Sequence, residues 1–204
     1  MSSREITLID AGTGNLHSVQ NAFEHLGARV LVTAEPGEVL HGGRLVLPGV
    51  GAFGRFMGGL RERGLEPAVV EAVRQGHPLL GICVGMQALF DVGEELGETA
   101  GLGLLPGRVV RFPAQDGLKV PHTGWNQIWR QRASGWLDGI PDGSHAYFNH
   151  SYYCAAEPGD WLAATEYGLR YASIVQRENI SGVQFHPEKS QRVGLAILEG
   201  FLKS

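Results

Sequence analysis

The first half of the chain alternates short apolar runs with segments of helical periodicity. Residues 6–9 are nearly all apolar, and from Leu16 to Leu26 apolar side chains recur at intervals of three and four until Gly27. Such a run predicts a buried strand, and the spacing after it predicts an amphipathic helix that ends at the glycine. Alternating strands and helices favour parallel strands joined by crossover connections.

The rest of the chain completes this pattern with more strands and two more helices. We expect strands at residues 30–32, 45–47 and 79–82, a helix at residues 65–75 and a last helix at about residues 193–202. Between residues 109 and 174, short β-like runs alternate with glycine and proline, which predicts antiparallel strands. The predicted fold class is α/β, a mostly parallel wound sheet flanked by helices, with antiparallel additions in the second half.

Composition and charge fit one globular domain and exclude some partners. With 204 residues and neither repeat nor linker, the chain is expected to form a single domain, residues 1–204. A formal net charge of -4 gives no basic surface for nucleic acid. No stretch approaches the ~20 apolar residues that cross a bilayer, and the N-terminus lacks a secretory signal. We therefore expect a cytoplasmic protein that binds neither nucleic acid nor membrane.

The cysteines and histidines form no disulfide or metal pattern. The two cysteines, Cys83 and Cys154, are too few for a disulfide framework, and the sequence has no Cys-x-x-Cys or clustered histidine motif. We expect no metal and no cofactor. Cys154 is predicted to be a packed, unreactive strand residue.

Cys83 is the first candidate for chemistry. It follows the apolar run 79–82, lies between Gly81 and Gly85, and precedes residues that predict the start of a helix. A strand, a sharp turn and a helix in this order expose a nucleophile, because glycines let the turn pack without a Cβ clash. The positive end of the helix favours a thiolate. The alternative is a buried core cysteine.

His186 is the candidate base, and Glu188 the candidate for its orientation. Residues 183–188 predict a strand that ends in a loop at His186, with a carboxylate two positions later. An imidazole held by a carboxylate on one nitrogen can present the other to a thiol, which is the arrangement of a catalytic triad. Alone, this segment would more simply be a solvated turn; together with Cys83 it favours a nucleophile, a base and an orienting acid.

These residues carry a resemblance to a known family. The runs from Gly81 to Gln87 and from His186 to Glu188 resemble class I, triad-type glutamine amidotransferases. Other stretches narrow the resemblance to glutaminase subunits of imidazole glycerol phosphate synthases, and these are Asp10 to Leu16 (DAGTGNL), Pro48 to Gly51 (PGVG), Lys119 to Asn126 (KVPHTGWN), His150 to Tyr153 (HSYY) and Glu188 to Ser190 (EKS). The resemblance extends from Ile6 to the last helix.

The chemistry of amide hydrolysis needs two donors for an oxyanion. The N–H of Val84, directly after the nucleophile, is expected to supply one, and the N–H of Val50 in the PGVG stretch the other. Because Gly49 and Gly51 flank Val50, the peptide between Gly49 and Val50 could turn over and switch the site on or off.

The resemblance also implies substrate and partner contacts. Gln87, one helical turn after Cys83, corresponds to a glutamine contact, as do Gly49, Gly51, Ser151 and Tyr152. The expected interface with a (β/α)₈-barrel cyclase subunit, in a heterodimer, consists of Pro121, His122, Trp125, Asn126, Tyr147 and Lys189. Two positions depart from the family pattern, since Asn149 replaces an apolar residue and Ala11 an aromatic one.

The resemblance therefore implies a glutaminase that releases ammonia for a cyclase, which makes imidazole glycerol phosphate and an aminoimidazole carboxamide ribonucleotide in histidine biosynthesis. Three alternatives remain at this point. A glutaminase for another acceptor, such as pyridoxal phosphate synthesis, shares the three catalytic candidates but lacks the narrower motifs. A cysteine hydrolase or peptidase would accept other amides and need no partner. A binding or redox-sensing module would not depend on Cys83 for glutamate release.

Overall fold

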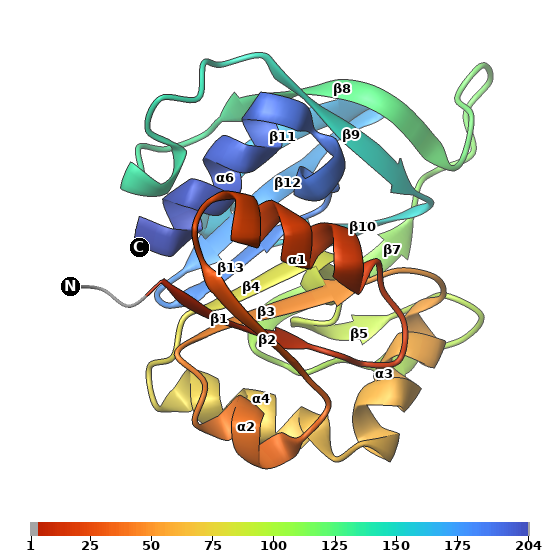
Figure 1. The fold of residues 1–204 in the computed structure, drawn as a ribbon. Coiled ribbons are helices and arrows are strands. Elements are labelled where there is room, and N and C mark those ends of the chain that lie inside the picture. The colour runs from red at the N-terminus through yellow and green to blue at the C-terminus, as the bar shows by residue number, and fades with distance from the viewer. Residues whose placement is uncertain (1–3, 204) are drawn as a thin grey trace.

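The computed structural model describes residues 4–203, which form a nine-stranded sheet with helices on both faces and a smaller four-stranded sheet beside it (Figure 1). The large sheet has the order β2-β1-β3-β4-β13-β12-β11-β8-β9. Its strands are β1 (Glu5–Ile9), β2 (Arg29–Thr33), β3 (Arg44–Gly49), β4 (Leu79–Cys83), β8 (His122–Arg130), β9 (Ser144–His150), β11 (Trp161–Tyr167), β12 (Leu169–Arg177) and β13 (Ile180–Val183).

The large sheet changes from parallel to antiparallel pairing in its middle. Strands β2, β1, β3, β4 and β13 are parallel neighbours, whereas β12, β11, β8 and β9 continue the sheet in antiparallel pairs. The smaller sheet contains β10 (Tyr152–Ala156), β7 (Leu105–Arg111), β5 (Phe90–Gly93) and β6 (Thr99–Ala100), in that order. The predicted α/β class is confirmed, and most of the antiparallel additions extend the parallel sheet itself.

Helices cover both faces of the sheet. Figure 1 shows α1 (Leu16–His25) and α6 (Gln191–Lys203) on one face, and α2 (Pro36–Leu40), α3 (Phe53–Glu62) and α4 (Leu65–Arg74) on the other. The short helices are α5 (Val84–Gln87), η1 (Gly135–Leu137), η2 (Pro158–Asp160) and η3 (Pro187–Lys189). The predicted helices at 16–26, 65–75 and 193–202 are confirmed. In the part of the chain that the structure describes, no helix has both the length and the apolar character needed to cross a membrane.

Helix α3 was not expected, because its amphipathic pattern is interrupted by glycines. Phe53, Phe56, Met57 and Leu60 are buried at helical spacing. Glycine is an unfavourable residue inside helices, and three glycines within ten residues obscure the pattern. The stabilisation from burying the apolar face of α3 outweighs the low helix propensity of its glycines.

The cysteine turn (residues 81–85) requires glycine for steric reasons. A Cβ at Gly85 would lie 1.8 Å from the carbonyl oxygen of Leu47, and one at Gly81 would lie 2.6 Å from the carbonyl oxygen of Gly85. Both neighbours are backbone atoms, which cannot move as a side chain can. Helix α5 therefore packs directly on β3 and β4, with backbone against backbone.

We expect Gly85→Ala to destabilise the isolated chain by about 3 kcal/mol, because the new Cβ forces β3 and α5 apart. The measurement is the unfolding free energy from urea denaturation. Gly58→Ala is the matched control, since a Cβ at Gly58 in α3 would meet no atom within 4 Å. That substitution should raise stability by about 0.5–1 kcal/mol. Equal stabilities for the two variants would contradict the steric account.

Candidate active site

Cys83 and His186 meet because their strands are neighbours in the sheet. Strand β13 pairs in parallel with β4, with Val183 opposite Ile82. Cys83 ends β4, and His186 follows β13 after two further residues. The carboxyl ends of parallel strands lie at one edge of a sheet, where open α/β folds place their ligands. Two segments separated by about a hundred residues thus form one site.

The side chains of Cys83, His186 and Glu188 lie next to one another. The Nδ1 atom of His186 lies 3.0 Å from the Oε1 atom of Glu188, and Cys83 is close enough to the imidazole to shift its pKa. Since Nδ1 is engaged by the carboxylate, Nε2 is the nitrogen that faces the sulfur. The Glu188 side chain is 1% exposed, so water weakens this interaction little.

These partners keep His186 protonated at neutral pH. Burial alone lowers the pKa of His186, but the hydrogen bonds and negative charge of Cys83 and Glu188 outweigh it and raise the pKa to about 10. An imidazolium beside a sulfur atom favours the thiolate, which is the nucleophilic form of cysteine.

The backbone of Cys83 is in the left-handed region, with φ 55° and ψ -112°. A non-glycine residue rarely adopts this conformation, and where it does it often marks a functional site. The predicted helix after Cys83 is present as α5, which is one turn of four residues. A single turn sums few peptide dipoles, and the imidazolium is therefore the main positive group near the thiol.

A cavity of about 280 Å³ opens beside the thiol. Its lining comes from the loops after β3 and β5, from the cysteine turn and α5, from the residue before β8, from the segment between β9 and β10, and from the His186 loop. The lining residues are Val50, Gly51, Cys83, Val84, Gln87, Glu95, Pro121, Asn149, His150, Ser151, Tyr152, His186 and Lys189. A larger hollow of about 460 Å³ lies against the edge strand β2, but its lining contains neither Cys83 nor His186.

Most residues expected to bind the substrate or the oxyanion line this cavity. Val50, Gly51, Val84, Gln87, Ser151 and Tyr152 are all among its lining residues. Gly49 is absent from the lining: it pairs with Cys83 in the β3–β4 register, and a Cβ there would lie 2.7 Å from the N atom of Gly85. The close packing of backbone on backbone at this position requires glycine.

Gln87 is buried and fixed by two acceptors. Its Nε2 atom donates to the carbonyl oxygen of Tyr152 at 3.1 Å and to the Oε1 atom of Gln184 at 3.2 Å. The Nε2 atom of Gln184 lies 4.0 Å from the sulfur of Cys83. Gln87 therefore connects the cysteine turn with the segment that carries Ser151 and Tyr152.

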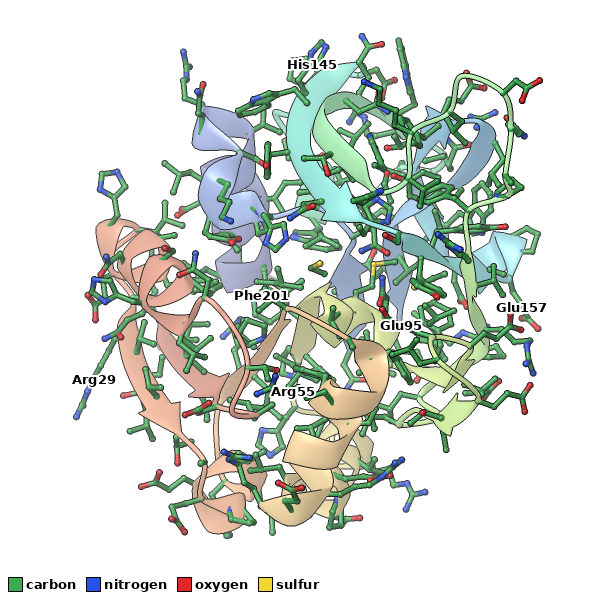
Figure 2. The ribbon with its side chains drawn as sticks, turned by 90° about the vertical axis from the view of Figure 1, so that its right-hand side faces the viewer. Arg29, Arg55, Glu95, His145, Glu157 and Phe201 are labelled. Carbon is green, nitrogen blue, oxygen red and sulfur yellow. The ribbon has the colours of Figure 1, made fainter. Side chains whose placement is uncertain are left out.

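Glu95 is a cavity residue that no motif in the sequence indicates. Its Oε2 atom accepts the backbone N–H of Phe53 at 2.7 Å, which fixes the carboxylate at the start of α3. Figure 2 places Glu95 near the middle of the molecule, between the first-half elements and the later strands. The signal in the sequence is weak, because Glu94 and Glu95 look like an ordinary solvated pair after a strand.

The expected interface residues divide between the two faces of β8. Trp125 is 49% exposed, its ring lies 6.1 Å from that of Tyr147, and the Nζ atom of Lys189 lies 5.9 Å from the Tyr147 ring. These three residues form an outward-facing cluster, and Pro121 is also exposed.

His122 differs from this expectation, because its side chain is only 3% exposed. Side chains alternate along a strand, so His122 and Asn126 lie on the face opposite Trp125. Asn126 uses its amide inside the protein, where Nδ2 donates to the carbonyl oxygen of Glu166 at 2.9 Å. Their side chains therefore act within the protein and not on its outward face.

The two positions that depart from the family pattern have local explanations. The Oδ1 atom of Asn149 accepts the hydroxyl of Thr123 on the neighbouring strand at 3.1 Å. Ala11 is buried, and its carbonyl oxygen lies 2.1 Å from the position of a Cβ on Gly59. The loop after β1 thus packs tightly on α3.

Ser190 connects strand β9 with the His186 loop. Its Oγ atom accepts the N–H of Tyr147 at 3.0 Å and donates to the carbonyl oxygen of His186 at 2.7 Å. The N–H of His186 donates to the carbonyl oxygen of Tyr147 at 2.9 Å. These bonds fix the backbone of His186 relative to β9.

Cys154 is packed in β10, as predicted, and is 1% exposed. Burial raises its pKa well above the ordinary value, and the charge of Cys83 adds to this effect. Its thiol stays protonated. Within residues 4–203, no cluster of three or more His, Cys, Asp or Glu side chains is arranged to hold a metal ion.

Comparison with known proteins assigns the family. The family profile described as "Glutamine amidotransferase class-I" matches residues 7–204. Curated relatives named "Imidazole glycerol phosphate synthase subunit HisH" include one from Moorella thermoacetica, 51% identical over 97% of this chain and 94% of its own. Another, from Geobacillus thermodenitrificans, is 50% identical over the same shares.

Solved structures show the same fold at lower identity. One titled "Crystal structure of glutamine amidotransferase" is 20% identical with a TM-score of 0.75, covering 97% of each chain. "Structure of PurLQS from Thermotoga maritima" is 15% identical with a TM-score of 0.76, covering 98% of this chain and 97% of that one. The chain belongs to the class-I glutamine amidotransferase family and, within it, groups with the HisH subunits of imidazole glycerol phosphate synthase.

Proposed function

We propose that Cys83, His186 and Glu188 hydrolyse the side-chain amide of glutamine in this chain. The protein is a glutamine amidotransferase subunit of imidazole glycerol phosphate synthase, an enzyme of histidine biosynthesis. The observation that carries the assignment of roles is the meeting of a strained cysteine and an imidazole–carboxylate pair beside one cavity.

The reaction starts with attack of the Cys83 thiolate on the carboxamide carbon. A carbon–sulfur bond forms, and the negative charge moves to the amide oxygen. When the carbon–nitrogen bond breaks, the His186 imidazolium gives its proton to the leaving ammonia. The neutral imidazole then takes a proton from water, which attacks the thioester and releases glutamate. Glu188 holds the ring in position throughout.

The oxyanion is assigned to the N–H groups of Val84 and Val50. Both residues line the same cavity as Cys83. Val50 is 36% exposed, and Gly51 after it has a φ of 87°. Of the two donors, the N–H of Val50 therefore lies in the less constrained backbone. Rotation of the peptide between Gly49 and Val50 makes or removes one donor. Loss of one such donor costs about 100- to 1,000-fold in rate.

The lining fits an amino acid with both a positive and a negative group. The carboxylate of Glu95 faces the α-ammonium group, while the backbone of Ser151 and Tyr152 holds the main-chain end of glutamine. Gln87, which is already bound to the Tyr152 carbonyl, keeps this segment at a fixed distance from Cys83.

The ammonia passes to the cyclase partner, which makes imidazole glycerol phosphate and an aminoimidazole carboxamide ribonucleotide. We assign the interface to the cluster of Trp125, Tyr147 and Lys189, with Pro121 beside it, and the partner is a (β/α)₈ barrel in a heterodimer. Two facts support this surface. Exposed aromatic residues are common anchors of interfaces, and Lys189 also lines the cavity, so a partner seated there lies next to the released ammonia.

The other readings of the sequence are less favoured. Relatives of about 50% identity carry the name of the histidine-pathway subunit, which does not favour a glutaminase for pyridoxal phosphate synthesis. A general cysteine hydrolase or peptidase would accept a wider range of substrates. A panel of amides and peptides tests this alternative, and we expect this chain to hydrolyse only glutamine among them.

Cys83→Ala should abolish glutamate release, by at least about 1,000-fold, because the covalent step is lost. The assay contains the cyclase subunit and its nucleotide substrate. Cys154→Ala is the matched control and should retain activity, since Cys154 is sealed in β10. With ammonium salt in place of glutamine, the Cys83→Ala complex should still make product. Glutamate release by Cys83→Ala would refute the thioester, and full activity of the isolated wild-type chain would refute the switch.

Glu95→Gln should raise KM for glutamine about 10- to 100-fold and change kcat little, because a half-buried charge that pairs with the α-ammonium group is removed while the acceptor for Phe53 stays. Steady-state kinetics of the complex measure both constants. Glu94→Gln is the control, as Glu94 pairs with Arg108 at the surface. A shared effect on the two variants, or an effect on kcat alone, would contradict the role of Glu95.

His186 should titrate near pH 10 in the isolated chain, followed by NMR of the ring. Its pKa is raised on folding, so the imidazolium stabilises the folded state fully below about pH 6.5, and this contribution is lost as the pH rises through about 10. Glu188→Gln removes a negative partner and should lower the pKa of His186. A midpoint near 6.5 in the wild-type protein would disprove the ion pair.

A further inference from the structure

A pair of buried histidines adjoins the cavity, and the mechanism above uses neither. His122 and His150 are 3% and 6% exposed, and the Nδ1 atom of His122 lies 3.2 Å from the Nε2 atom of His150. The hydroxyl of Tyr171 lies 3.2 Å from each of these two atoms. Aromatic rings enclose this group, and they belong to Phe112, Phe148, Tyr153 and Tyr167.

Both rings are neutral at physiological pH. Burial lowers the pKa of His122 to about 4. Burial also lowers the pKa of His150, to about 3. The hydrogen bond to the Tyr152 carbonyl raises this pKa, but burial outweighs it, and the nearby His122 and His186 also lower the pKa. A neutral imidazole has one N–H donor and one acceptor nitrogen. The hydrogen-bond partners therefore determine which nitrogen of each ring carries the proton.

Asn126 sets the orientation of His122. The Oδ1 atom of Asn126 accepts the backbone N–H of Gln127 at 2.8 Å, so the other end of the amide is the NH₂ group. That Nδ2 atom lies 3.2 Å from the Nε2 atom of His122 and donates to it. Nε2 is then the acceptor, and the proton of His122 is on Nδ1, which faces His150 and Tyr171.

The carbonyl of Tyr152 sets the orientation of His150. The Nδ1 atom of His150 lies 2.7 Å from this oxygen, and a carbonyl can only accept. The proton of His150 is therefore on Nδ1, and its Nε2 accepts from the His122 side. The hydrogen bonds run in one direction, from Asn126 through His122 and His150 to Tyr152.

The series ends at the corner where the chain leaves one sheet for the other. Ser151 separates β9 of the large sheet from β10 of the small one. The carbonyl of Ser151 accepts the N–H of Phe112 at 3.1 Å, and that of Tyr152 accepts from both His150 and Gln87. Both carbonyls at the corner are engaged by the protein, which fixes the planes of the peptides beside the cavity.

We propose that His150 and His122 are positioning residues of the glutaminase site: their directed hydrogen bonds hold the Ser151–Tyr152 corner in the conformation that binds the main-chain end of glutamine. His150 acts on the corner directly, and His122 acts through His150. The inference rests on the proposed function, because it assigns the corner to substrate binding.

A purely structural role does not require these side chains. Apolar residues of similar size fill a core without the cost of burying polar groups. A buried series of polar groups specifies one conformation only when every donor and acceptor in it has a partner. Here each ring nitrogen has a partner of the correct kind. The series also joins β8, which carries Trp125 on its opposite face, to the cavity.

Two substitutions of His150 separate positioning from packing. In His150→Asn, the amide nitrogen takes the place of Nδ1 and still donates to the Tyr152 carbonyl. In His150→Gln, the amide lies near the former Nε2 and the donor to Tyr152 is lost. Glutamine hydrolysis is measured in the complex with the cyclase subunit and its nucleotide substrate. We expect His150→Gln to raise KM for glutamine about 10-fold with kcat changed less than about threefold, and His150→Asn to stay near the wild-type KM.

The controls separate failure of this inference from failure of the proposed function. Wild-type protein and Cys83→Ala test the glutaminase itself, and the ammonium-dependent reaction of each complex tests assembly. His77→Gln, at the amino end of β4 and away from the cavity, should leave both constants unchanged. Equal KM values for His150→Gln and His150→Asn, or a change confined to kcat, would overturn the positioning role while the glutaminase assignment stands.

Further measurements remain decisive if His150→Gln does not fold. In the wild-type chain, ¹⁵N NMR of the rings should show both His122 and His150 neutral at pH 7 with the proton on Nδ1. A proton on Nε2 of either ring, or a charged ring, would overturn the inference. Tyr171→Phe and His122→Leu should each raise KM by a few-fold, and in combination they should raise it by less than the product of the single effects, because both act along one series.

Discussion

The site depends on one strained residue, the left-handed backbone of Cys83. This conformation costs about 1–3 kcal/mol in a non-glycine residue, and it persists because α5 packs on β3 and β4 at backbone distance. Gly85 and Gly81 make that contact possible. The strain directs the thiol into the cavity, and the nearness of β13 brings an imidazolium to it. Other parts of the structure, including both sheets, keep those two elements in register.

Much of the fold follows from local patterns. Strands β1 to β4 and helices α1, α4 and α6 were expected near their observed positions, because apolar periodicity and terminal glycines are local signals. Helix α3 was not, because glycines obscured its apolar stripe. Antiparallel strands were also expected from local runs, but their attachment to the parallel sheet had no local signal, since pairing between distant strands is set by the packing of the whole core.

The three chemical candidates in the sequence converge in the structure, but two other features needed coordinates. The orientation of His122 depends on which alternate side chains of β8 face the core, and a register shift of one residue would have turned the His122 side chain outward. Glu95 lies in a loop and reaches the cavity only because the N–H of Phe53 fixes its carboxylate. Sequence motifs thus identified the reacting groups, while the groups that shape the cavity came from tertiary contacts.

The hydrogen bonds around Ser190 have a mechanical consequence. Strand β9 is the outer edge of the large sheet, and three hydrogen bonds join the backbone of Tyr147 to that of His186, two of them through the short Ser190 side chain. A displacement of this edge strand therefore also displaces the imidazole of His186. A force applied from outside to this edge of the sheet can therefore change the position of the His186 Nε2 atom relative to the Cys83 sulfur without rearrangement of interior residues.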